Sequence, residues 1–385
     1  MGTASVLVLA TLETKAREAE YLIDRLKEHG AAARIVDISL NTGGVVQDGP
    51  GKLARMNATV AEARNVAEAA IAEGCRAVVG IGGGTGGEIC IRVMRALPIT
   101  FPKVLVTTLP FDPRAAVAES SIILVPTLAD ISGLNTVIRE VLGKAAVITA
   151  GLSAIPNTPP APSIGITGLG ANEAAVAALV HALDRRGEES TVFHSNGYGG
   201  AAFARFAAMG AFWAIVDMTP HELTRIHLAG ARVDMPGRFT AAADLPRLML
   251  PGALNFLGLG ELSTLPATYR GRPHYAHSGF FTHVKLEPDE MRLIASELAK
   301  VLNAAKGPTA LIVPMGGFSH QDCPGGAIED GNLRQVFLDQ VRQDISPRTV
   351  VHPMDAHISA PEVTETILAS LDGLTAFQTK ADPDV

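Results

Sequence analysis

The sequence predicts an α/β protein with two Rossmann-like domains, each with a mainly parallel sheet flanked by helices, and a cleft between them. At 385 residues the chain is longer than one hydrophobic core usually serves. Near-continuous Val/Ile/Leu runs alternate with amphipathic helical segments, as in parallel sheets covered on both faces. The proline-rich stretch "TAGLSAIPNTPPAPS" at 149–163 interrupts this alternation, which then restarts. We therefore expect an N-terminal domain at 1–155 and a C-terminal domain at 163–375.

The first domain opens with the strand "SVLVLA" at 5–10, followed by a helix that ends at Gly30. The helix is predicted from apolar residues at i, i+3, i+4 and i+7, which are Ala19, Leu22, Ile23 and Leu26. Further strands are expected at 33–39, 77–82, 103–108 and 121–126, with helices at 56–73, after the glycines at 82–87, and at 134–150.

In the second domain, each apolar run ends in polar residues or glycine. These runs lie at 163–170, 191–200, 214–223, 248–255, 273–279, 309–317 and 348–357. Ligands of doubly wound sheets bind beyond the carboxyl ends of the strands. We therefore expect the polar ends to line one crevice.

Composition excludes several classes of partner. The chain has 32 Lys+Arg against 39 Asp+Glu and no basic block, which argues against nucleic acid. The N-terminus lacks a basic region before its short apolar run, and no apolar stretch approaches membrane-spanning length. The three scattered cysteines, Cys75, Cys90 and Cys323, indicate neither a disulfide framework nor a zinc knuckle. A cytoplasmic protein without membrane or nucleic-acid partners is expected.

The strongest local signal is "VVGIGGGTGGEIC" at 78–90, where a strand runs into Gly82, Gly83, Gly84, Thr85, Gly86 and Gly87 before a helix. The glycine spacing matches the dinucleotide fingerprint. However, the loop follows the third strand, and the next strand ends in threonines instead of an acid that would bind ribose. Bare amides at a helix N-terminus suit a phosphate or carboxylate. A tight turn with positive φ would explain only one or two of the glycines. We predict an anion or nucleotide site.

A second candidate segment is "ATLETK" at 10–15. Thr11 and Thr14 could cap the helix that starts there, while Lys15 in its first turn opposes the helix dipole and indicates a nearby phosphate. Asp37 could bind a ribose hydroxyl or cap the following loop. In "TLADISGLN" at 127–135, Asp130 and Asn135 are best interpreted as cap residues.

The second domain carries candidate substrate and catalytic residues. The predicted substrate-binding residues are His194, Gly199, Gly200, Gly252 and Asn255. The densest polar cluster, at 314–326, contains Ser319, His320, Asp322 and Cys323. A triad is defined by geometry, so the base could come from His277, His283 or the Asp355–His357 segment. His274, His277, His283, His320 and His357 show no diagnostic metal-ligand spacing, and we predict no metal.

Six segments in order resemble one family: "VLATLETK", "GIGGGTGGEI", "FHSNGYGG", "PGALN", "PGGAIED" and "DAHISAPE". This is the bacterial and fungal family of conserved proteins of unassigned activity that also forms the N-terminal ATP-binding domain of the tomato mosaic virus resistance protein. The resemblance covers about residues 4–370. It implies two Rossmann-like domains, ATP binding, a homodimer, and association with a separate TIM-barrel protein.

Carried onto this sequence, the family's nucleotide segment is Thr11, Thr14 and Lys15 with Gly82–Gly87. The second domain departs from the family pattern. It has "HSNGYGG" for His-Ala-Thr-Gly-Thr-Gly-Gly, Asn255 for an acid, and His277–Ser278 for a His-Asn pair. "MGGFS" at 315–319 replaces Leu-Arg-Gly-x-Ser, so that arginine is missing.

The leading hypothesis is an ATP-binding protein. Phosphates would lie on the amides of the glycine loop near Lys15, Mg²⁺ would balance their charge, and a small substrate would bind in the interdomain cleft. One alternative is a hydrolase or lyase of a small oxo-acid or ester, in which Ser319 or a water attacks and His277 or His320 moves the proton. Another is a non-enzymatic ligand sensor or partner inhibitor. The Ser319, His320 and Asp322 cluster favours an enzyme over a pure sensor.

Overall fold

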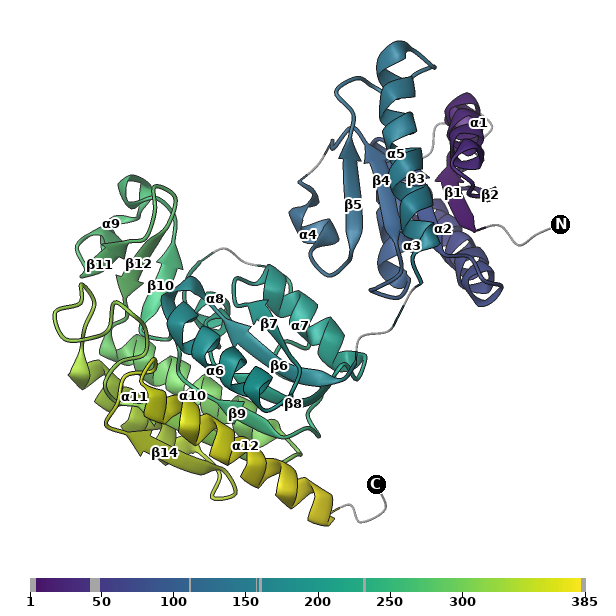
Figure 1. The fold of residues 1–385 in the computed structure, drawn as a ribbon. Helices are drawn as coiled ribbons and strands as arrows, with labels where there is room; N and C mark the ends of the chain where they lie inside the picture. The colour runs from purple at the N-terminus through teal and green to yellow at the C-terminus, as the bar shows by residue number, and fades with distance from the viewer. Residues whose placement is uncertain are drawn as a thin grey trace. The chain divides into compact units, whose positions relative to one another are not determined.

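The computed structural model describes residues 5–41, 49–110, 112–156, 158, 161–230 and 233–381. The chain divides into two compact units, unit 1 (Met1–Pro159) and unit 2 (Pro160–Val385). Each has a mainly parallel sheet flanked by helices, so the predicted fold class is confirmed (Figure 1). In the expected crossing segment, residues 149–154 belong to a helix, and residues 157, 159 and 160 lie outside the described residues.

Unit 1 holds a five-stranded, all-parallel sheet of order β2-β1-β3-β4-β5. Its strands are β1 Val6–Ala10, β2 Ala33–Asp37, β3 Ala77–Ile81, β4 Lys103–Thr107 and β5 Ile122–Pro126. This doubly wound order has its topological switch point between β1 and β3, where such sheets bind ligands at their carboxyl edge. The glycine loop directly follows β3.

The helices around this sheet, within the described residues, are α1 Leu12–Glu28, α2 Gly49–Ala72, α3 Gly84–Ala96, α4 Pro113–Val117 and α5 Thr136–Ala154. Because side chains alternate along a strand, β1 sends Leu7 to a core with α2 and α3, and Val8 to a core with α1 and α5. α2 starts seven residues before its predicted start at 56, since Pro50 is tolerated in a first turn. The short α4 was not predicted.

Unit 2 is built on a six-stranded parallel sheet of order β14-β13-β9-β8-β6-β7, with its switch point between β6 and β8. Its strands are β6 Ser163–Gly168, β7 Ser190–His194, β8 Phe212–Asp217, β9 Arg247–Met249, β13 Thr309–Pro314 and β14 Val350–Met354. The helices are α6 Glu173–Arg185, α7 Tyr198–Ala208, α8 Glu222–His227, α9 Ala267–Arg270, α10 Pro288–Ala304, α11 Gly331–Asp344 and α12 Pro361–Ala381, with short 3₁₀ turns η1 Gly170–Asn172 and η2 Leu262–Thr264.

A separate antiparallel sheet of order β10-β12-β11 corrects one expectation. Its strands are β10 Phe256–Leu259, β11 His274–Ala276 and β12 Thr282–Lys285. The run at 273–279 therefore lies in this small sheet and does not end at the carboxyl edge of the parallel one. The sequence signal failed because these strands are only three or four residues long, too short for a period to show.

No helix in the described part of the chain combines the length and the apolar character that a membrane crossing needs.

Candidate functional site

The glycine loop of unit 1 lies between hydroxyl groups from both neighbouring strands. A Cβ built on Gly86 would lie 3.4 Å from Cγ2 of Thr11, which follows β1. One built on Gly83 would lie 3.4 Å from Oγ1 of Thr108, which follows β4. Thr11 in turn lies 3.1 Å from Thr14, hydroxyl to hydroxyl. The carboxyl ends of β1, β3 and β4 thus bring amides and hydroxyls together.

The glycines of this loop divide into two kinds. A Cβ on Gly82 would overlap the backbone of Gly86 and Gly87, so this glycine is needed to bring the end of β3 against α3. A Cβ on Gly84 meets nothing within 4 Å, and those on Gly83 and Gly86 have only ordinary van der Waals contacts. The expectation that positive φ explains some of these glycines is wrong, because none between Gly82 and Gly87 adopts it. Gly83 has φ −84° and ψ −126°, a backbone conformation outside the regions that residues with a Cβ favour. The fold therefore does not account for two of the five glycines, Gly84 and Gly86.

The N-terminus of α3 is also uncapped. Its N-cap residue, Gly83, has no side chain to accept a hydrogen bond. Within the described residues, no acceptor lies on the N–H groups of Gly84, Thr85 or Gly86. Free N–H groups at the positive end of a helix dipole are the features from which proteins build anion-binding sites.

The neighbouring helix α1 is capped by its own chain. The N–H of Leu12 donates to Oδ1 of Asp37 at 3.1 Å, and the N–H of Glu13 donates to Oγ of Ser39 at 3.1 Å. Although burial raises the pKa of Asp37, hydrogen bonds from Ser39 and Leu12 outweigh that effect and hold it below its ordinary value. Of the two predicted roles for Asp37, the structure shows a cap, and it serves the helix before β2 as well as the loop after it.

The structure also shows the contacts of Lys15, Asn135 and Asp130, for which the sequence predicted a phosphate neighbour or a cap. Lys15 Nζ donates to the carbonyl of Ile131 at 2.7 Å, so its ammonium group is held at the loop after β5 instead of at the glycine loop. Asn135 caps α5 by accepting from the N–H of Ile138 at 3.0 Å, as predicted. Asp130 accepts from the N–H of Ile131 at 2.8 Å, within its own loop.

The second glycine loop, at 196–200, is filled by the protein itself. A Cβ on Gly199 would overlap the carbonyl of His194, and Gly197 has φ +92°. A Cβ on Gly200 would lie 2.6 Å from Oε1 of Glu222, so the Glu222 carboxylate occupies the N-terminus of α7. A Cβ on Gly252 would likewise overlap backbone. Every one of these glycines has a structural reason, unlike Gly84 and Gly86 of the first loop.

Glu222 belongs to a buried charge network that the sequence did not reveal. Arg238 donates to both oxygens of Asp217 at 2.8 Å and to Oε2 of Glu222 at 3.3 Å. Burial raises the pKa of Glu222, whereas Arg238 and Thr167 overcome the same effect at Asp217 and lower its pKa. The position of Asp217 at the end of an apolar strand was a usable signal, but nothing marked Arg238.

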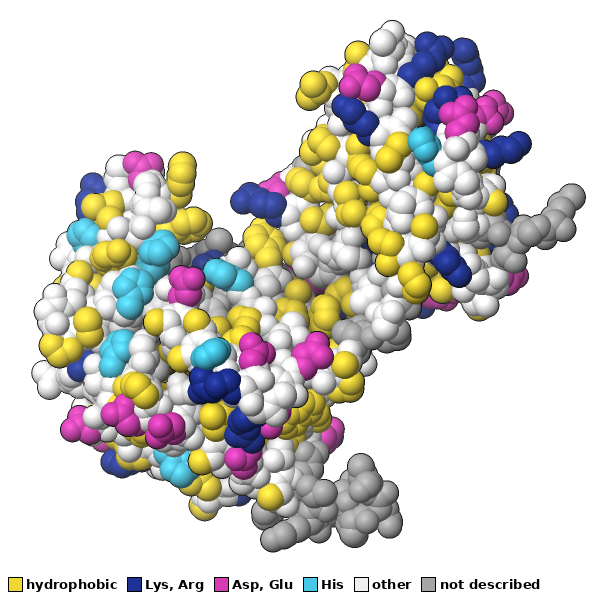
Figure 2. Space-filling model, viewed as in Figure 1, with side chains coloured by type: hydrophobic (Ala, Val, Ile, Leu, Met, Phe, Trp, Pro, Cys, Tyr) yellow, Lys and Arg dark blue, Asp and Glu magenta, His cyan; other side chains and the backbone are white. Residues whose placement is uncertain are grey.

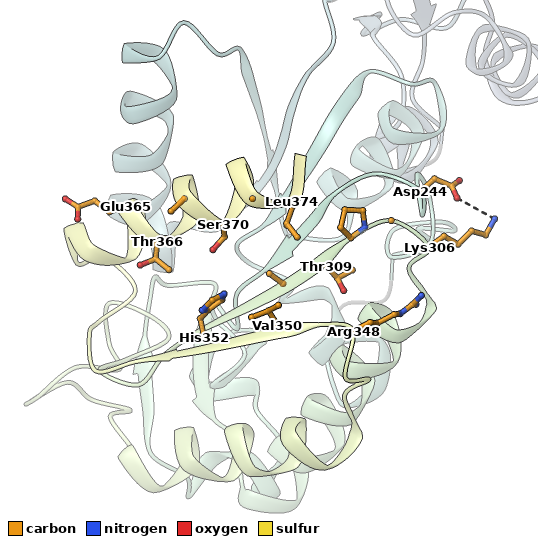
Figure 3. Close-up of a pocket in the computed structure, with 15 residues that line it drawn as sticks. Asp244, Lys306, Thr309, Arg348, Val350, His352, Glu365, Thr366, Ser370 and Leu374 are labelled. Atoms are coloured by element: carbon orange, nitrogen blue, oxygen red, sulfur yellow. Dashed lines mark ion pairs between the residues drawn. The ribbon is translucent and has the colours of Figure 1, made fainter. Parts of the chain in front are cut away.

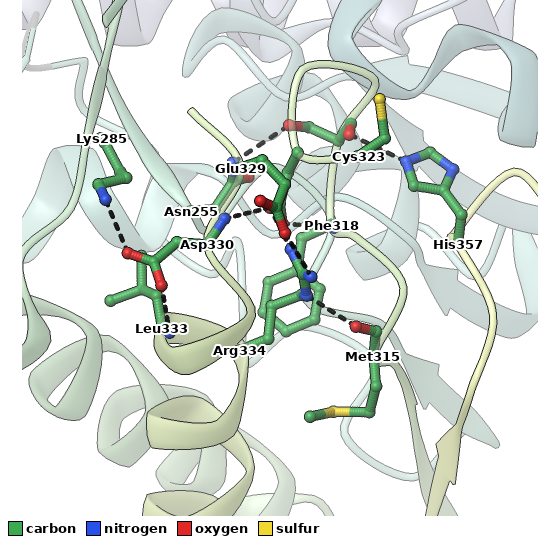
Figure 4. Close-up of polar contacts among 12 residues, drawn as sticks. Asn255, Lys285, Met315, Phe318, Cys323, Glu329, Asp330, Leu333, Arg334 and His357 are labelled. Atoms are coloured by element: carbon green, nitrogen blue, oxygen red, sulfur yellow. Dashed lines mark hydrogen bonds and ion pairs between the residues drawn. The ribbon is translucent and has the colours of Figure 1, made fainter. Parts of the chain in front are cut away.

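The Ser319 segment does not form a triad among the described residues, and Figure 4 shows Asn255, Arg334 and His357, which make polar contacts with this segment. The buried Ser319 hydroxyl accepts from Nδ2 of Asn255 at 3.2 Å, and His357 Nε2 donates to the Ser319 carbonyl at 3.0 Å. Asp322 accepts from the N–H of Phe318 and is ion-paired with Arg334. Among the described residues, no histidine ring is hydrogen-bonded to the Ser319 hydroxyl.

The remaining bonds of this segment tie it to the strand ends. His320 Nδ1 lies 3.1 Å from the carbonyl of Ala171, and Arg334 also donates to the carbonyl of Met315 at 2.7 Å. Burial raises the pKa of Asp322, even with Arg334 beside it. The arrangement fixes this turn at the carboxyl edge.

A column of rings joins the small sheet to this edge. His221 lies 4.8 Å from Phe256, Phe256 stacks on His283 at 4.0 Å, and His283 stacks on His277 at 4.8 Å, centroid to centroid. Burial lowers the pKa of His221 to about 3 and that of His283 to about 4. Figure 2 shows histidines gathering on one face of unit 2. Within the described ranges, no three His, Cys, Asp or Glu side chains are grouped to hold a metal.

A large cavity of unit 2 lies away from all predicted site residues. It measures about 1160 Å³ and is lined by the amino ends of β13 and β14 and by α12 (Figure 3). Two of its cationic side chains already have partners: Lys306 pairs with Asp244, which lines the same cavity, at 3.7 Å, and Arg348 donates to the carbonyl of Asn303 at 2.7 Å. We assign it no role.

Two doubly wound sheets, the first with a glycine-rich helix N-terminus, place the chain in the class of two-domain α/β proteins. The models of an uncharacterised protein family, UPF0261, match residues 41–157 with its N-terminal domain and residues 161–375 with its C-terminal domain. The chain belongs to the UPF0261 family, which confirms the resemblance.

Relatives span the chain. A UPF0261 protein of Mesorhizobium japonicum is 32% identical over 95% of this chain and 98% of its own length, and one of Brucella suis is 27% identical over 95% and 94%. The ToMV resistance protein Tm-1(GCR237) of Solanum lycopersicum is 26% identical over 76% of this chain and 41% of its own length.

Proposed function

We propose that unit 1 binds ATP through its phosphates at the N-terminus of α3. The observation that carries this proposal is the uncapped first turn of α3, in which the N–H groups of Gly84, Thr85 and Gly86 have no acceptor among the described residues. The neighbouring helix α1, in contrast, is capped by Asp37. Two glycines that the fold does not require, Gly84 and Gly86, support the same site, since only glycine lets backbone approach a phosphate so closely.

Side chains around the loop would complete the site. The hydroxyls of Thr11, Thr14 and Thr108 supply hydrogen bonds to phosphate oxygens. Lys15 reaches the phosphates only by leaving the Ile131 carbonyl. Mg²⁺ would be held by phosphate oxygens and water, which suits an ion that keeps much of its hydration shell. Asp37 already caps α1, so we do not assign it to the ribose.

Two other functions have less support. For a hydrolase centred on Ser319, no base in the described part of the chain is hydrogen-bonded to the Ser319 hydroxyl, and Asp322 is ion-paired with Arg334. A ligand sensor fits the same phosphate site without chemistry, so ATP turnover separates it from an enzyme. The homodimer, the TIM-barrel partner and the cytoplasmic location stay predictions from the sequence.

Calorimetric titration with ATP, with and without Mg²⁺, tests the proposal. Gly84→Val places a side chain where the phosphates would lie, yet its Cβ meets nothing within 4 Å. Gly143→Val is the matched control, because Gly143 is also a helical glycine with open space around its Cβ. Since hydrogen bonds to charged groups contribute about 1.5–3 kcal/mol, we expect Gly84→Val to weaken ATP about 10- to 100-fold.

The control should bind ATP like the unaltered protein. Equal ATP affinity in folded Gly84→Val, or no ATP binding at all, would contradict the proposal. Release of phosphate during the titration would favour an enzyme over a sensor.

A further inference from the structure

Arg225, on the short helix α8 of unit 2, is a partly buried cation without an acceptor. Its guanidinium makes no hydrogen bond and no ion pair among the described residues. The Nε atom is fully buried, whereas Nη1 and Nη2 keep surface that solvent or a ligand can reach. A guanidinium stays charged in proteins, and a charged donor at a partly buried position favours an acceptor. The accessible end of Arg225 is therefore suited to an anionic ligand.

The acids of the neighbouring charge network are already bound by another arginine. Arg238 donates to both oxygens of Asp217 at 2.8 Å and to Oε2 of Glu222, one turn before Arg225, at 3.3 Å. Arg247 adds a further positive charge to the same network. Two carboxylates thus face three guanidinium groups, which leaves at least one positive charge in excess. Of the three guanidinium groups, that of Arg225 is the one whose terminal nitrogens are both unbonded and accessible among the described residues.

His221 lies beside the guanidinium and helps to place it. Arg225 follows His221 by four residues on α8, so the two side chains share one face. A Cβ built on Gly258 of β10 would lie 3.1 Å from His221 Nε2 and 3.6 Å from Arg225 Nη2, so both nitrogens lie over this glycine. His221 Nδ1 is 2.7 Å from the carbonyl of Ala253, which can only accept, so the ring proton is on Nδ1 and Nε2 carries a lone pair. This lone pair attracts the guanidinium but does not cancel its charge.

His194 supplies a second polar group at the same edge of the sheet. It ends β7, and its side chain is exposed. The loop that follows it contacts α8, because the N–H of Gly197 donates to Oε1 of Glu222 at 3.5 Å. Partial burial and, after it, the charge of Arg225 lower the pKa of His194 below its ordinary value. A neutral imidazole donates one N–H, so His194 can add a donor to those of Arg225.

We propose that Arg225 and His194 bind the carboxylate of a small organic acid at the carboxyl edge of the unit 2 sheet. Two N–H groups of a guanidinium match the two oxygens of a carboxylate in a charge-assisted pair. A phosphate needs more donors, and the N-terminus of α7, which would supply them, is occupied by Glu222. Ligands of doubly wound sheets bind at this edge. The site does not depend on the phosphate site proposed for unit 1.

Nuclear magnetic resonance of the His194 ring in the full-length protein, during titration with acetate at constant ionic strength, tests the proposal. Acetate carries the carboxylate alone, and His194→Gln identifies the ring signal. We expect a saturable shift and a rise in the pKa of His194, because a bound negative charge stabilises the imidazolium. Acetamide has a similar shape without the charge and should bind at least about tenfold more weakly.

Arg225→Met removes the charge and keeps most of the volume. It should abolish acetate binding and raise the pKa of His194 in the absence of ligand, because a nearby positive charge is lost. Arg186→Met is the matched control, since Arg186 is also partly exposed but is paired with Asp372. This control should bind acetate like the unaltered protein. The comparison of acetate with acetamide uses the unaltered protein and tests the proposal even if Arg225→Met does not fold.

Five results would each overturn the proposal. They are the absence of a saturable acetate shift, equal binding of acetate and acetamide, acetate binding retained in folded Arg225→Met, acetate binding lost in Arg186→Met, and inorganic phosphate binding at least about tenfold more tightly than acetate. The last result would assign the site to phosphate.

Discussion

Oδ1 of Asp37, at the end of β2, accepts the N–H of Leu12 at 3.1 Å, and thereby closes the N-terminus of α1. Ser39 Oγ accepts the next N–H, from Glu13, at 3.1 Å. The adjacent helix start, at Gly84 of α3, has no such acceptor among the residues that the structure describes. This difference between neighbouring helices is why we propose the anion site at the loop after β3.

Asp37→Ala should therefore weaken the fold without weakening ATP binding. Loss of a helix cap costs about 0.5–2 kcal/mol of unfolding free energy. Urea denaturation measures that loss, and a parallel ATP titration should give an unchanged affinity. If Asp37→Ala is as stable as the unaltered protein and binds ATP tenfold more weakly, Asp37 binds the ribose instead.

Gly82→Ala and Gly84→Ala should separate folding from binding within one loop. A Cβ on Gly82 overlaps the backbone of Gly87, so Gly82→Ala should cost about 1–3 kcal/mol or more. A Cβ on Gly84 meets open space, and Gly84→Ala should range from neutral to about 1 kcal/mol more stable. Thermal unfolding of both variants gives the comparison. Equal destabilisation by the two would mean that the loop is glycine-rich for folding alone.

Asp322→Ala should behave as a structural variant. Asp322 is 1% exposed and ion-paired with buried Arg334, and breaking such a pair from one side costs about 3–5 kcal/mol. Ser319→Ala, which removes one hydroxyl bonded to Asn255, should cost about 1 kcal/mol. Denaturant unfolding of both variants tests this order. If the Asp322→Ala protein is fully stable, the ion pair is not needed for the fold, and Asp322 is again a candidate catalytic residue.

Acid should destabilise unit 2 through His221. Burial lowers its pKa to about 3 in the folded protein, against about 6.5 when unfolded. The unfolded state then binds more protons between these values, so the unfolding free energy falls as pH drops below about 6.5 and stops falling near 3.

The slope near pH 5 should be about 1 kcal/mol per pH unit from this one residue. Denaturation at two acidic pH values should show a shallower dependence in His221→Asn, whose amide can still donate to the Ala253 carbonyl that His221 Nδ1 contacts at 2.7 Å. An unchanged slope would mean that His221 is not held neutral by burial.

The sequence was informative where local pattern and topology coincide. Apolar runs such as 77–82 became parallel strands, and the glycine loop fell at the switch point of its sheet because helices alternate with strands there. The caps were ambiguous for a physical reason. Asp37 lies 25 residues from Leu12 in the sequence, so no local signal could assign it to α1.

The second unit was harder to predict, because its contacts are long-range. From the sequence alone, Gly200 predicts a loop with open space beside its backbone. In the structure, the side chain of Glu222, 22 residues further along the chain, occupies that space. The stack of His277 on His283 depends on an antiparallel pairing too short to recognise. Arg238 and Arg247 carry no pattern at all, since their burial is decided by the packing of the whole unit.

The amide ¹H–¹⁵N resonances of Gly84, Thr85 and Gly86, followed during addition of ATP to the full-length protein, test the central claim most directly. The account predicts that these three signals shift together and saturate with the affinity that calorimetry gives. If ATP binds and the three amide signals do not shift, the phosphates lie elsewhere, and the assignment of the α3 N-terminus as the phosphate site is contradicted.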